Sequence, residues 1–391
     1  MLNRDIIREA TRLTRSGQLV EATELLQRML RGEKERGATA PMAGHPALAA
    51  GGEPPTIDAK ANAAETRRPR RAAQPAVEIA KNLHGFGLGG ALRRAPPSMA
   101  DIVPDGAKFV EGVYANAAGS RAYRLFIPSG YHGQAIPLVV MLHGCTQSPE
   151  DFAAGTRMNF CAEEQTCFVA YPAQRAEANQ AKCWNWFRPA DQQRGGGEPS
   201  LIAGITRQIM RDHSIDPERV YVAGLSAGAA AAAVMGSTYG DLYAAIGIHS
   251  GLACGAASDL PSALMAMKQG GGPEAMPSDG PPVPTIVFHG DRDTTVHSKN
   301  GAQIVRQAIG GFRTTAKVHR GRVPGGHAYT RMVHTDARGR AILEHWEIHG
   351  AGHAWSGGSP AGSYTDPDGP DATREMLRFF LEHSLQRRQN Y

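Results

Sequence analysis

One serine in the sequence lies in a motif that can activate its hydroxyl for nucleophilic attack. Residues 224–228 read GLSAG, which fits the pattern G-x-S-x-G with Ser226 at its centre. The apolar segment 220–223 precedes the motif, and an alanine-rich segment typical of a helix follows it. A serine at such a strand-to-helix turn has an exposed hydroxyl, and the glycines allow close backbone packing. This context favours a nucleophile over an incidental serine at a glycine-rich strand end.

A serine hydroxyl attacks only when a base removes its proton. His353 is the best candidate, because it lies in the glycine-containing loop 350–355 directly after a predicted strand at 342–349. His345 and His349 lie inside that strand and are expected to be ordinary strand residues. We therefore predict that His353 is the general base.

The acid that orients the base should follow a strand between these two residues. The apolar segment 283–288 is followed by HGDRDTTV at 289–296, so two aspartates lie at the carboxyl end of a strand. We expect Asp293 to orient His353 and Asp291 to cap the turn. The order serine, aspartate, histidine is the chain order of α/β-hydrolases.

Two backbone N–H groups are candidates for holding the oxyanion of an acyl-transfer intermediate. Ala227 follows the serine, and Cys145 lies in the segment HGCTQ at 143–147, directly after the apolar segment 136–142. The alternative is that Cys145 acts as a nucleophile with His143 as its base. Their places at one strand end point them to opposite sides, which disfavours it.

Aromatic and apolar residues near these motifs are candidates for substrate contact. They are Trp184 and Trp186 in the segment CWNWF, Leu225 in the serine motif, and Trp355 two residues after the base. The alternative for the tryptophans of CWNWF is packing in the core, where tryptophan is common.

The elements that must position these residues alternate between strands and helices. Such alternation predicts an α/β fold with a mostly parallel, doubly wound sheet and flanking helices. Expected strands are 108–114, 121–127, 136–142, 167–171, 220–223, 244–248, 283–288, 330–334 and 342–349. Expected helices are 201–213, 226–237, 260–268, 301–308 and 373–385.

Length and composition limit the functional classes. The chain has 391 residues, 41% hydrophobic and 20% charged, and no apolar run of 18 residues that would predict a membrane span. Residues 1–105 contain 16 Lys and Arg against 12 Asp and Glu, whereas residues 106–391 contain 26 against 25. A nearly neutral main domain is a poor nucleic-acid binder.

Three segments are expected along the chain. Residues 1–31 have helical apolar periodicity and predict an amphipathic helix, which could dock onto a protein partner or simply be an appendage. Residues 32–105 are rich in Pro, Gly and Ala and predict a linker, and residues 106–391 form the catalytic domain. Charged residues interrupt any apolar core of a secretory signal near the N-terminus, so the sequence leaves the compartment open.

The cysteines do not form a disulfide framework or a zinc motif. There are five, at Cys145, Cys161, Cys167, Cys183 and Cys254, and none forms a CxxC pair. One or two disulfides are compatible with this number, and the pairing stays open. No metal ligands or cofactor motif are predicted.

Together the motifs resemble those of polyhydroxybutyrate (PHB) depolymerase-type esterases of the α/β-hydrolase superfamily. The resemblance covers about residues 106–385 and rests on LHGCTQ (142–147), YP (171–172), CWNWF (183–187), GLSAG (224–228), HSGL (249–252), HGDRD (289–293) and GH (352–353). The motif order is similar to the type 1 catalytic domain of short-chain-length polyhydroxyalkanoate depolymerases. The resemblance implies hydrolysis of 3-hydroxyalkanoate polyesters or related carboxylic esters, without a cofactor, by proteins that are commonly extracellular.

Two departures from that pattern affect the expected substrate. Neither a secretion signal nor a separate polymer-adsorbing domain is evident, so soluble oligomers or small esters are expected rather than solid polyester. Esterases acting on acetylated or feruloylated polysaccharide share the architecture and are the main alternative. A hydrolase-fold protein that binds without catalysis is a further alternative, which the complete Ser226, Asp293 and His353 set disfavours.

Overall fold

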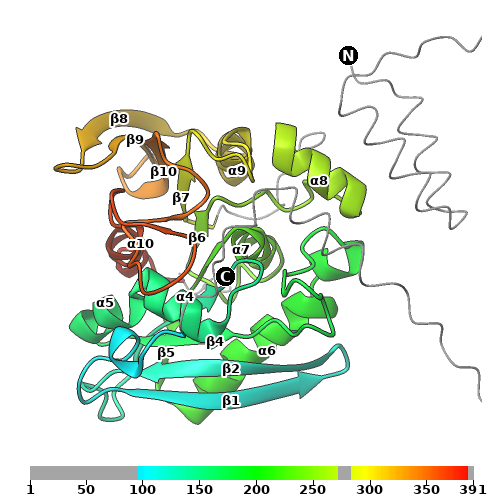
Figure 1. The fold of residues 1–391 in the computed structure, drawn as a ribbon, viewed down its shortest axis with the longest axis vertical. Helices are drawn as coiled ribbons and strands as arrows, with labels where there is room; N and C mark the ends of the chain where they lie inside the picture. The colour runs from blue at the N-terminus through cyan, green and yellow to red at the C-terminus, as the bar shows by residue number, and fades with distance from the viewer. Residues whose placement is uncertain (1–95, 272–282, 386–391) are drawn as a thin grey trace, which may run out of the picture. The chain divides into compact units, whose positions relative to one another are not determined.

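A ten-stranded sheet organises the computed structural model, which describes residues 96–271 and 283–385 (Figure 1). The strand order is β1-β2-β4-β3-β5-β6-β7-β10-β9-β8. The strands from β4 to β10 in this order are parallel, and the strands outside them pair antiparallel. The predicted α/β fold with a mostly parallel sheet is therefore confirmed.

The bounds of the elements follow the predicted alternation. The strands are β1 (Lys108–Asn116), β2 (Gly119–Ile127), β3 (Ile136–Leu142), β4 (Phe168–Pro172), β5 (Ile215–Leu225), β6 (Ala245–His249), β7 (Thr285–Gly290), β8 (Thr315–Arg322), β9 (Ala328–Thr335), β10 (Ala341–His349), β11 (Trp355–Ser356) and β12 (Thr365–Asp366). The helices are η1 (Met99–Asp101), α4 (Pro149–Thr156), α5 (Met158–Gln165), η2 (Pro189–Gln192), α6 (Gly197–Asp212), α7 (Ala227–Thr238), α8 (Leu260–Gln269), α9 (Lys299–Ile309) and α10 (Ala372–Leu381).

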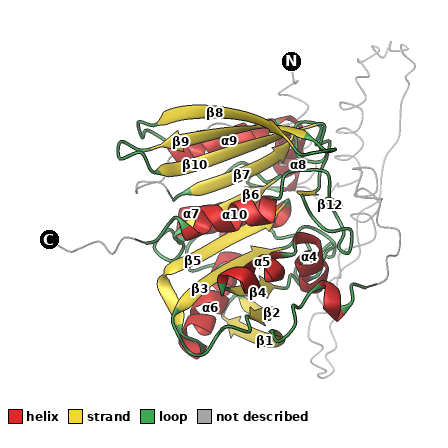
Figure 2. Ribbon diagram, turned by 90° about the vertical axis from the view of Figure 1, so that its left-hand side faces the viewer, coloured by secondary structure: helices red, strands yellow, loops and turns green. Residues whose placement is uncertain are grey.

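The sheet is covered on both faces, which explains its continuous apolar strands. Every residue of β3 is buried. Leu138 and Val140 pack in one core with residues of α6, α7, α8 and α9, whereas Val139 and Met141 pack in a second core with residues of α4, α5 and α10. Figure 2 shows the helices arranged along the sheet. Because neighbouring side chains enter different cores, each position of a central strand must be apolar.

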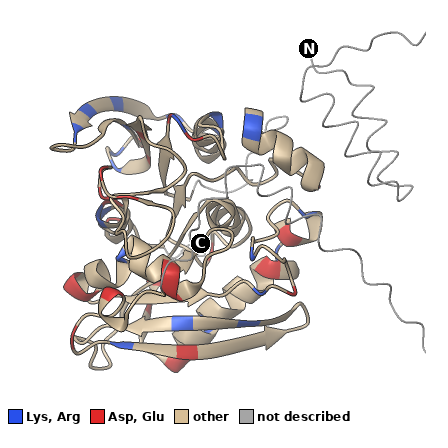
Figure 3. Ribbon diagram, viewed as in Figure 1, with Lys and Arg blue, Asp and Glu red and all other residues tan. Residues whose placement is uncertain are grey.

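The edge strand β8 is exposed and carries charged side chains. All residues of β8 except Gly321 are exposed, and the strand contains Lys317, Arg320 and Arg322. Figure 3 shows Lys and Arg in blue on this edge of the sheet. Charged side chains on an edge strand discourage pairing with another chain.

Several features differ from the sequence-based expectations. The structure adds α4, α5 and β8, which the apolar patterns did not predict, and extends β5 backward from 220 to Ile215. The predicted linker 32–105 ends too late, because Ile102 is buried in the core and its carbonyl accepts a hydrogen bond from Asn159. The predicted amphipathic helix 1–31 and the rest of that linker up to residue 95 lie outside the described residues.

Close backbone packing holds the serine motif against the sheet. A Cβ on Gly228 would clash with the carbonyl oxygens of Leu142 and His143 at the end of β3. A Cβ on Gly224 would likewise clash with the backbone of Gly228. The two glycines therefore let α7 begin in direct contact with the strand ends.

We predict that Gly228→Ala destabilises the protein, because the added methyl group forces α7 away from β3. Overpacking of this kind costs about 1–3 kcal/mol. Thermal denaturation should show a clear fall in the melting temperature. Gly311→Ala is the matched control, because a Cβ at Gly311 meets nothing within 4 Å, and an equal effect of the two substitutions would contradict this packing.

Candidate active site

Ser226 lies on a strained turn between β5 and α7. Its backbone has φ 57° and ψ −120°, a conformation that residues with a side chain rarely adopt. The Ser226 N–H donates a hydrogen bond of 2.9 Å to the carbonyl of His249, the last residue of β6. The residue is half-buried. This is the turn that the GLSAG motif predicts.

The segment 143–147 lies beside the serine. A Cβ built on Gly144 would lie 3.7 Å from Ser226 Cβ and 3.5 Å from the Leu225 carbonyl oxygen. Within the described part of the chain, neither the Cys145 N–H nor the Ala227 N–H donates a hydrogen bond to a protein acceptor. Two N–H groups next to the serine are thus available to a ligand.

His143 fixes the direction of the Cys145 N–H. Its Nδ1 donates to the Gly144 carbonyl at 2.8 Å, and its Nε2 accepts from the Gln174 N–H at 3.0 Å. The Gly144 carbonyl and the Cys145 N–H belong to one planar trans peptide and point in opposite directions, so fixing one fixes the other. Burial lowers the pKa of His143 to about 4, which keeps the ring neutral and this tautomer in place.

A disulfide and two hydrogen bonds attach this segment to residues 181–184. Cys145 is bonded to Cys183, Thr146 N–H donates to the Ala181 carbonyl at 2.7 Å, and Trp184 Nε1 donates to the His143 carbonyl at 3.1 Å. With its sulfur in a disulfide, Cys145 has no thiol to act as a nucleophile. Cys161, Cys167 and Cys254 are free.

Asp293 and His353 form a buried hydrogen-bonded pair. His353 Nδ1 lies 2.6 Å from Asp293 Oδ2, and the side chains are 9% and 0% exposed. Burial alone raises the pKa of Asp293, but the hydrogen bond and charge of His353 outweigh it, so the net shift is downward. An ionised Asp293 accepts the hydrogen bond from the Nδ1–H of His353. The lone pair of His353 Nε2 can then accept a proton.

The two aspartates divide their roles differently from the prediction. Asp293, rather than Asp291, caps the turn, because its Oδ1 accepts from the N–H groups of Thr295 and Val296. Asp291 instead accepts from the Gly350 N–H at 2.7 Å and contacts His349 Nδ1 at 3.0 Å. It therefore ties the end of β10, where the loop of His353 begins, to the end of β7.

Sequence reasoning gave no role to His289, which supports the acid. Its Nε2 donates to the Val296 carbonyl at 2.8 Å and lies 3.6 Å from Asp293 Oδ2. Burial lowers the pKa of His289, so the ring stays neutral. The sequence signal that could have indicated this role is the position of His289 in the segment HGDRD, four residues before Asp293.

The three predicted triad residues follow three strands that end at the same edge. Ser226 follows β5, Asp293 follows β7, and His353 follows β10, which pairs parallel with β7. No hydrogen bond joins the Ser226 hydroxyl to the His353 imidazole in the described ranges. In substrate-free enzymes this bond is often long and tightens when substrate binds.

All four predicted substrate-contact residues lie in the core instead. Trp184, Leu225 and Trp355 are 0%, 1% and 1% exposed, so the expectation that they touch substrate is wrong. Trp355 packs edge-on against Phe152, and its Nε1 donates to Thr373 Oγ1. Trp186, at 7% exposed, also packs in a core cluster. Trp184 and Trp186 both pack in the core, which was the alternative for these two residues.

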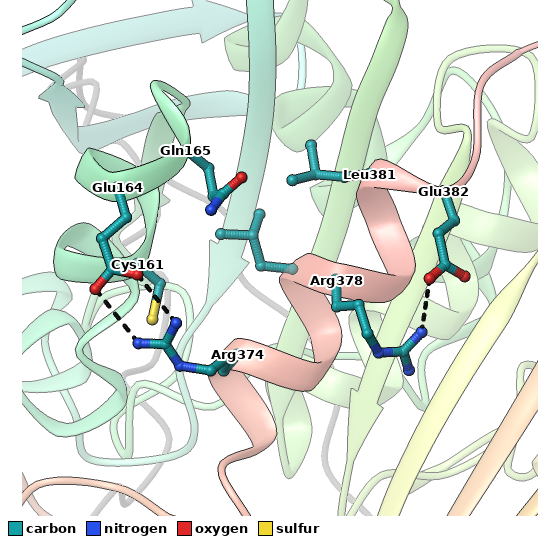
Figure 4. Close-up of a pocket in the computed structure, with 8 residues that line it drawn as sticks. Cys161, Glu164, Gln165, Arg374, Arg378, Leu381 and Glu382 are labelled. Carbon is teal, nitrogen blue, oxygen red and sulfur yellow. Dashed lines mark hydrogen bonds and ion pairs between the residues drawn. The ribbon is translucent and has the colours of Figure 1, made fainter.

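A cavity of about 320 Å³ lies away from these residues, between α5 and α10 (Figure 4). An ion pair between Arg374 and Glu164 crosses it, and Cys161 and Leu377 contribute to its lining. None of the predicted site residues borders it, so it is not the candidate active site.

The family model named Esterase PHB depolymerase matches residues 121–322, more than half of the chain. The chain belongs to this family. The match includes Ser226, Asp293 and Cys145 and ends before His353.

Curated relatives include both polyester and polysaccharide esterases. The poly(3-hydroxyalkanoate) depolymerase C of Paucimonas lemoignei is 35% identical over 58% of this chain and 56% of its own length. The probable acetylxylan esterase A of Aspergillus clavatus is 28% identical over 45% of this chain and 61% of its own length. The chain thus spans less than two thirds of the length of these relatives.

A solved structure shares the fold of this chain. The structure of an acetyl xylan esterase from Aspergillus awamori aligns with a TM-score of 0.54 and 19% identity, covering 71% of this chain and 99% of that chain. At this identity the likeness concerns the α/β-hydrolase fold alone.

We predict that Asp293→Asn lowers kcat for an ester by about 10²–10⁴-fold. The amide would donate to His353 Nδ1 and shift the imidazole proton to Nε2, where it blocks proton removal from serine. Asp291→Asn is the matched control, because its amide oxygen still accepts from the Gly350 N–H. Steady-state kinetics should show less than a tenfold loss for Asp291→Asn, and the opposite ranking would exchange the two roles.

Proposed function

We propose that this chain is a serine hydrolase of carboxylic esters that acts on short-chain poly- or oligo-3-hydroxyalkanoates. The observation behind this proposal is the 2.6 Å pair of His353 and Asp293 at the sheet edge that also holds the strained Ser226 turn. An acid, an imidazole whose Nδ1 is bound to that acid, and a serine on a sharp turn are the parts that acyl transfer needs.

The reaction proceeds through an acyl-enzyme. His353 Nε2 takes the proton of Ser226 as Oγ attacks the ester carbonyl, and the N–H groups of Cys145 and Ala227 bind the oxyanion. Collapse of the intermediate breaks the ester C–O bond, and His353 gives its proton to the departing alcohol. Water, deprotonated by His353, then attacks the acyl group, and serine leaves with the proton.

The choice of substrate class rests on similarity. Membership of the PHB depolymerase esterase family and the polyhydroxyalkanoate depolymerase relative support hydroxyalkanoate esters. The acetylxylan esterase relatives and the feruloyl esterase B of Neurospora crassa, 33% identical over 32% of this chain, support acetylated or feruloylated polysaccharide as the second candidate.

We predict that Ser226→Ala lowers the hydrolysis of p-nitrophenyl butyrate by about 10⁴-fold or more, because the nucleophile is lost. The folded state of the variant is checked by circular dichroism. The exposed Ser258 provides the control, and Ser258→Ala should retain full activity. Retained activity in folded Ser226→Ala would refute the assignment of the nucleophile.

A panel of natural esters separates the two substrate candidates. Purified protein should release 3-hydroxybutyrate from hydroxybutyrate oligomers at least about tenfold faster than acetate from acetylated xylan or ferulate from feruloylated xylan. Faster release from either polysaccharide would replace the proposed substrate class while leaving the mechanism in place.

A further inference from the structure

His249 touches the segments that bear all three proposed catalytic residues. It is the last residue of β6 and is completely buried. Its backbone carbonyl accepts the Ser226 N–H at 2.9 Å. Its ring Nε2 accepts the Ser356 N–H at 3.0 Å, three residues after His353. These two bonds connect the serine turn to the loop of the base through one residue.

The imidazole of His249 is held between two aromatic rings. It stacks on Trp355 with the centroids 5.0 Å apart at 25°, and on Phe288 with the centroids 5.7 Å apart at 11°. Phe288 belongs to β7, the strand that leads to Asp293. The ring therefore also contacts the strand of the acid, and its plane is fixed on both faces.

The hydrogen bonds of His249 require one tautomer. Because Nε2 accepts from Ser356, the neutral ring has its proton on Nδ1, which donates to Ser250 Oγ at 3.2 Å. Burial, with smaller contributions from the nearby His289 and His353, lowers the pKa of His249 to about 3. The ring is thus a permanent acceptor for the Ser356 N–H rather than an acid or base.

We propose that His249 is a positioning residue that holds the base His353 in reach of the nucleophile Ser226. Only Ala354 and Trp355 separate His353 from Ser356, and His249 contacts both Trp355 and Ser356. Loss of the ring acceptor would leave the buried Ser356 N–H without a partner and release this segment. The inference rests on the proposed esterase function and assigns a role that neither the motif nor the triad supplies.

Two substitutions separate the acceptor from the stacking ring. His249→Phe keeps an aromatic ring between Phe288 and Trp355 but removes the acceptor. His249→Gln loses the ring but retains an amide oxygen with a similar reach. We expect His249→Phe to lower kcat for p-nitrophenyl butyrate by about 10–100-fold with KM changed less than threefold, as expected when a base is displaced by about 1 Å. His249→Gln should restore kcat to within about fivefold of the wild type.

Rates are expressed per active site titrated with a fluorophosphonate, so that loss of folded protein does not count as loss of catalysis. His334→Phe is the control, because His334 is also buried on a strand but lies on β9, and its ring hydrogen-bonds only to Thr314 among the residues described. It should change kcat less than twofold. Unchanged kcat per site in His249→Phe, or equal losses in the Phe and Gln variants, would overturn the proposal.

Hydrogen–deuterium exchange gives a second readout that does not depend on activity. Backbone amides of residues 353–356 should exchange at least about tenfold faster in His249→Phe than in the wild type and His249→Gln, because the Ser356 N–H has lost its acceptor. Equal protection in all three proteins would contradict the role of His249. Absence of ester turnover by the wild type would refute the proposed function, whereas the exchange result would still decide this inference.

Discussion

The strained backbone of Ser226 is the constraint on which the site depends. A residue with a side chain at φ 57° and ψ −120° costs about 1–3 kcal/mol relative to ordinary backbone, and it persists only where the surroundings hold it. Here the surroundings are the close contacts of Gly224 and Gly228 with neighbouring backbone and the hydrogen bond from the Ser226 N–H to the His249 carbonyl. The packed core of the sheet thus supplies the free energy that keeps the serine on its turn.

Three buried histidines hold the segments around the candidate site in place. His143 orients the peptide of Cys145, His249 holds the segment after His353, and His289 lies beside Asp293. Burial lowers the pKa of each of them, so that each keeps one donor and one acceptor in fixed places. The ring of His353 differs, because it pairs directly with an ionised aspartate.

Local patterns were sufficient to predict the sheet except its edge strand β8, and to select the candidates for catalysis. Ser226, Asp293 and His353 each follow a buried strand, and strand ends are visible as apolar runs that stop at glycine or charge. The structure brings Asp293 and His353 into a hydrogen bond, whereas none joins the Ser226 hydroxyl to the His353 imidazole among the described residues. The helix α4 was not predicted, because its apolar residues show little helical periodicity. Its start does carry a signal, since the Ser148 side chain accepts a hydrogen bond from the Asp151 N–H and Pro149 is the first helical residue.

Features that depend on contacts between distant segments were not predictable. The pairing of Cys145 with Cys183, the burial of Trp355 against Phe152 and His249, and the hydrogen bond from the Gly350 N–H to Asp291 all depend on which loops pack together at the sheet edge. The spacing of residues along the chain does not indicate which distant segments come into contact. The chain's place in the PHB depolymerase esterase family agrees with the motifs but leaves such side-chain roles to geometry.

A crystal structure of the protein with a phosphonate ester bound covalently to Ser226 would decide whether these segments form one catalytic centre. We expect the phosphonyl oxygen about 2.7–3.1 Å from the nitrogens of Cys145 and Ala227. His353 Nε2 should lie about 2.6–3.2 Å from Ser226 Oγ or the leaving-group oxygen position. A phosphonyl oxygen turned toward solvent, or an imidazole that stays out of reach of the serine, would show that the proposed centre is wrong.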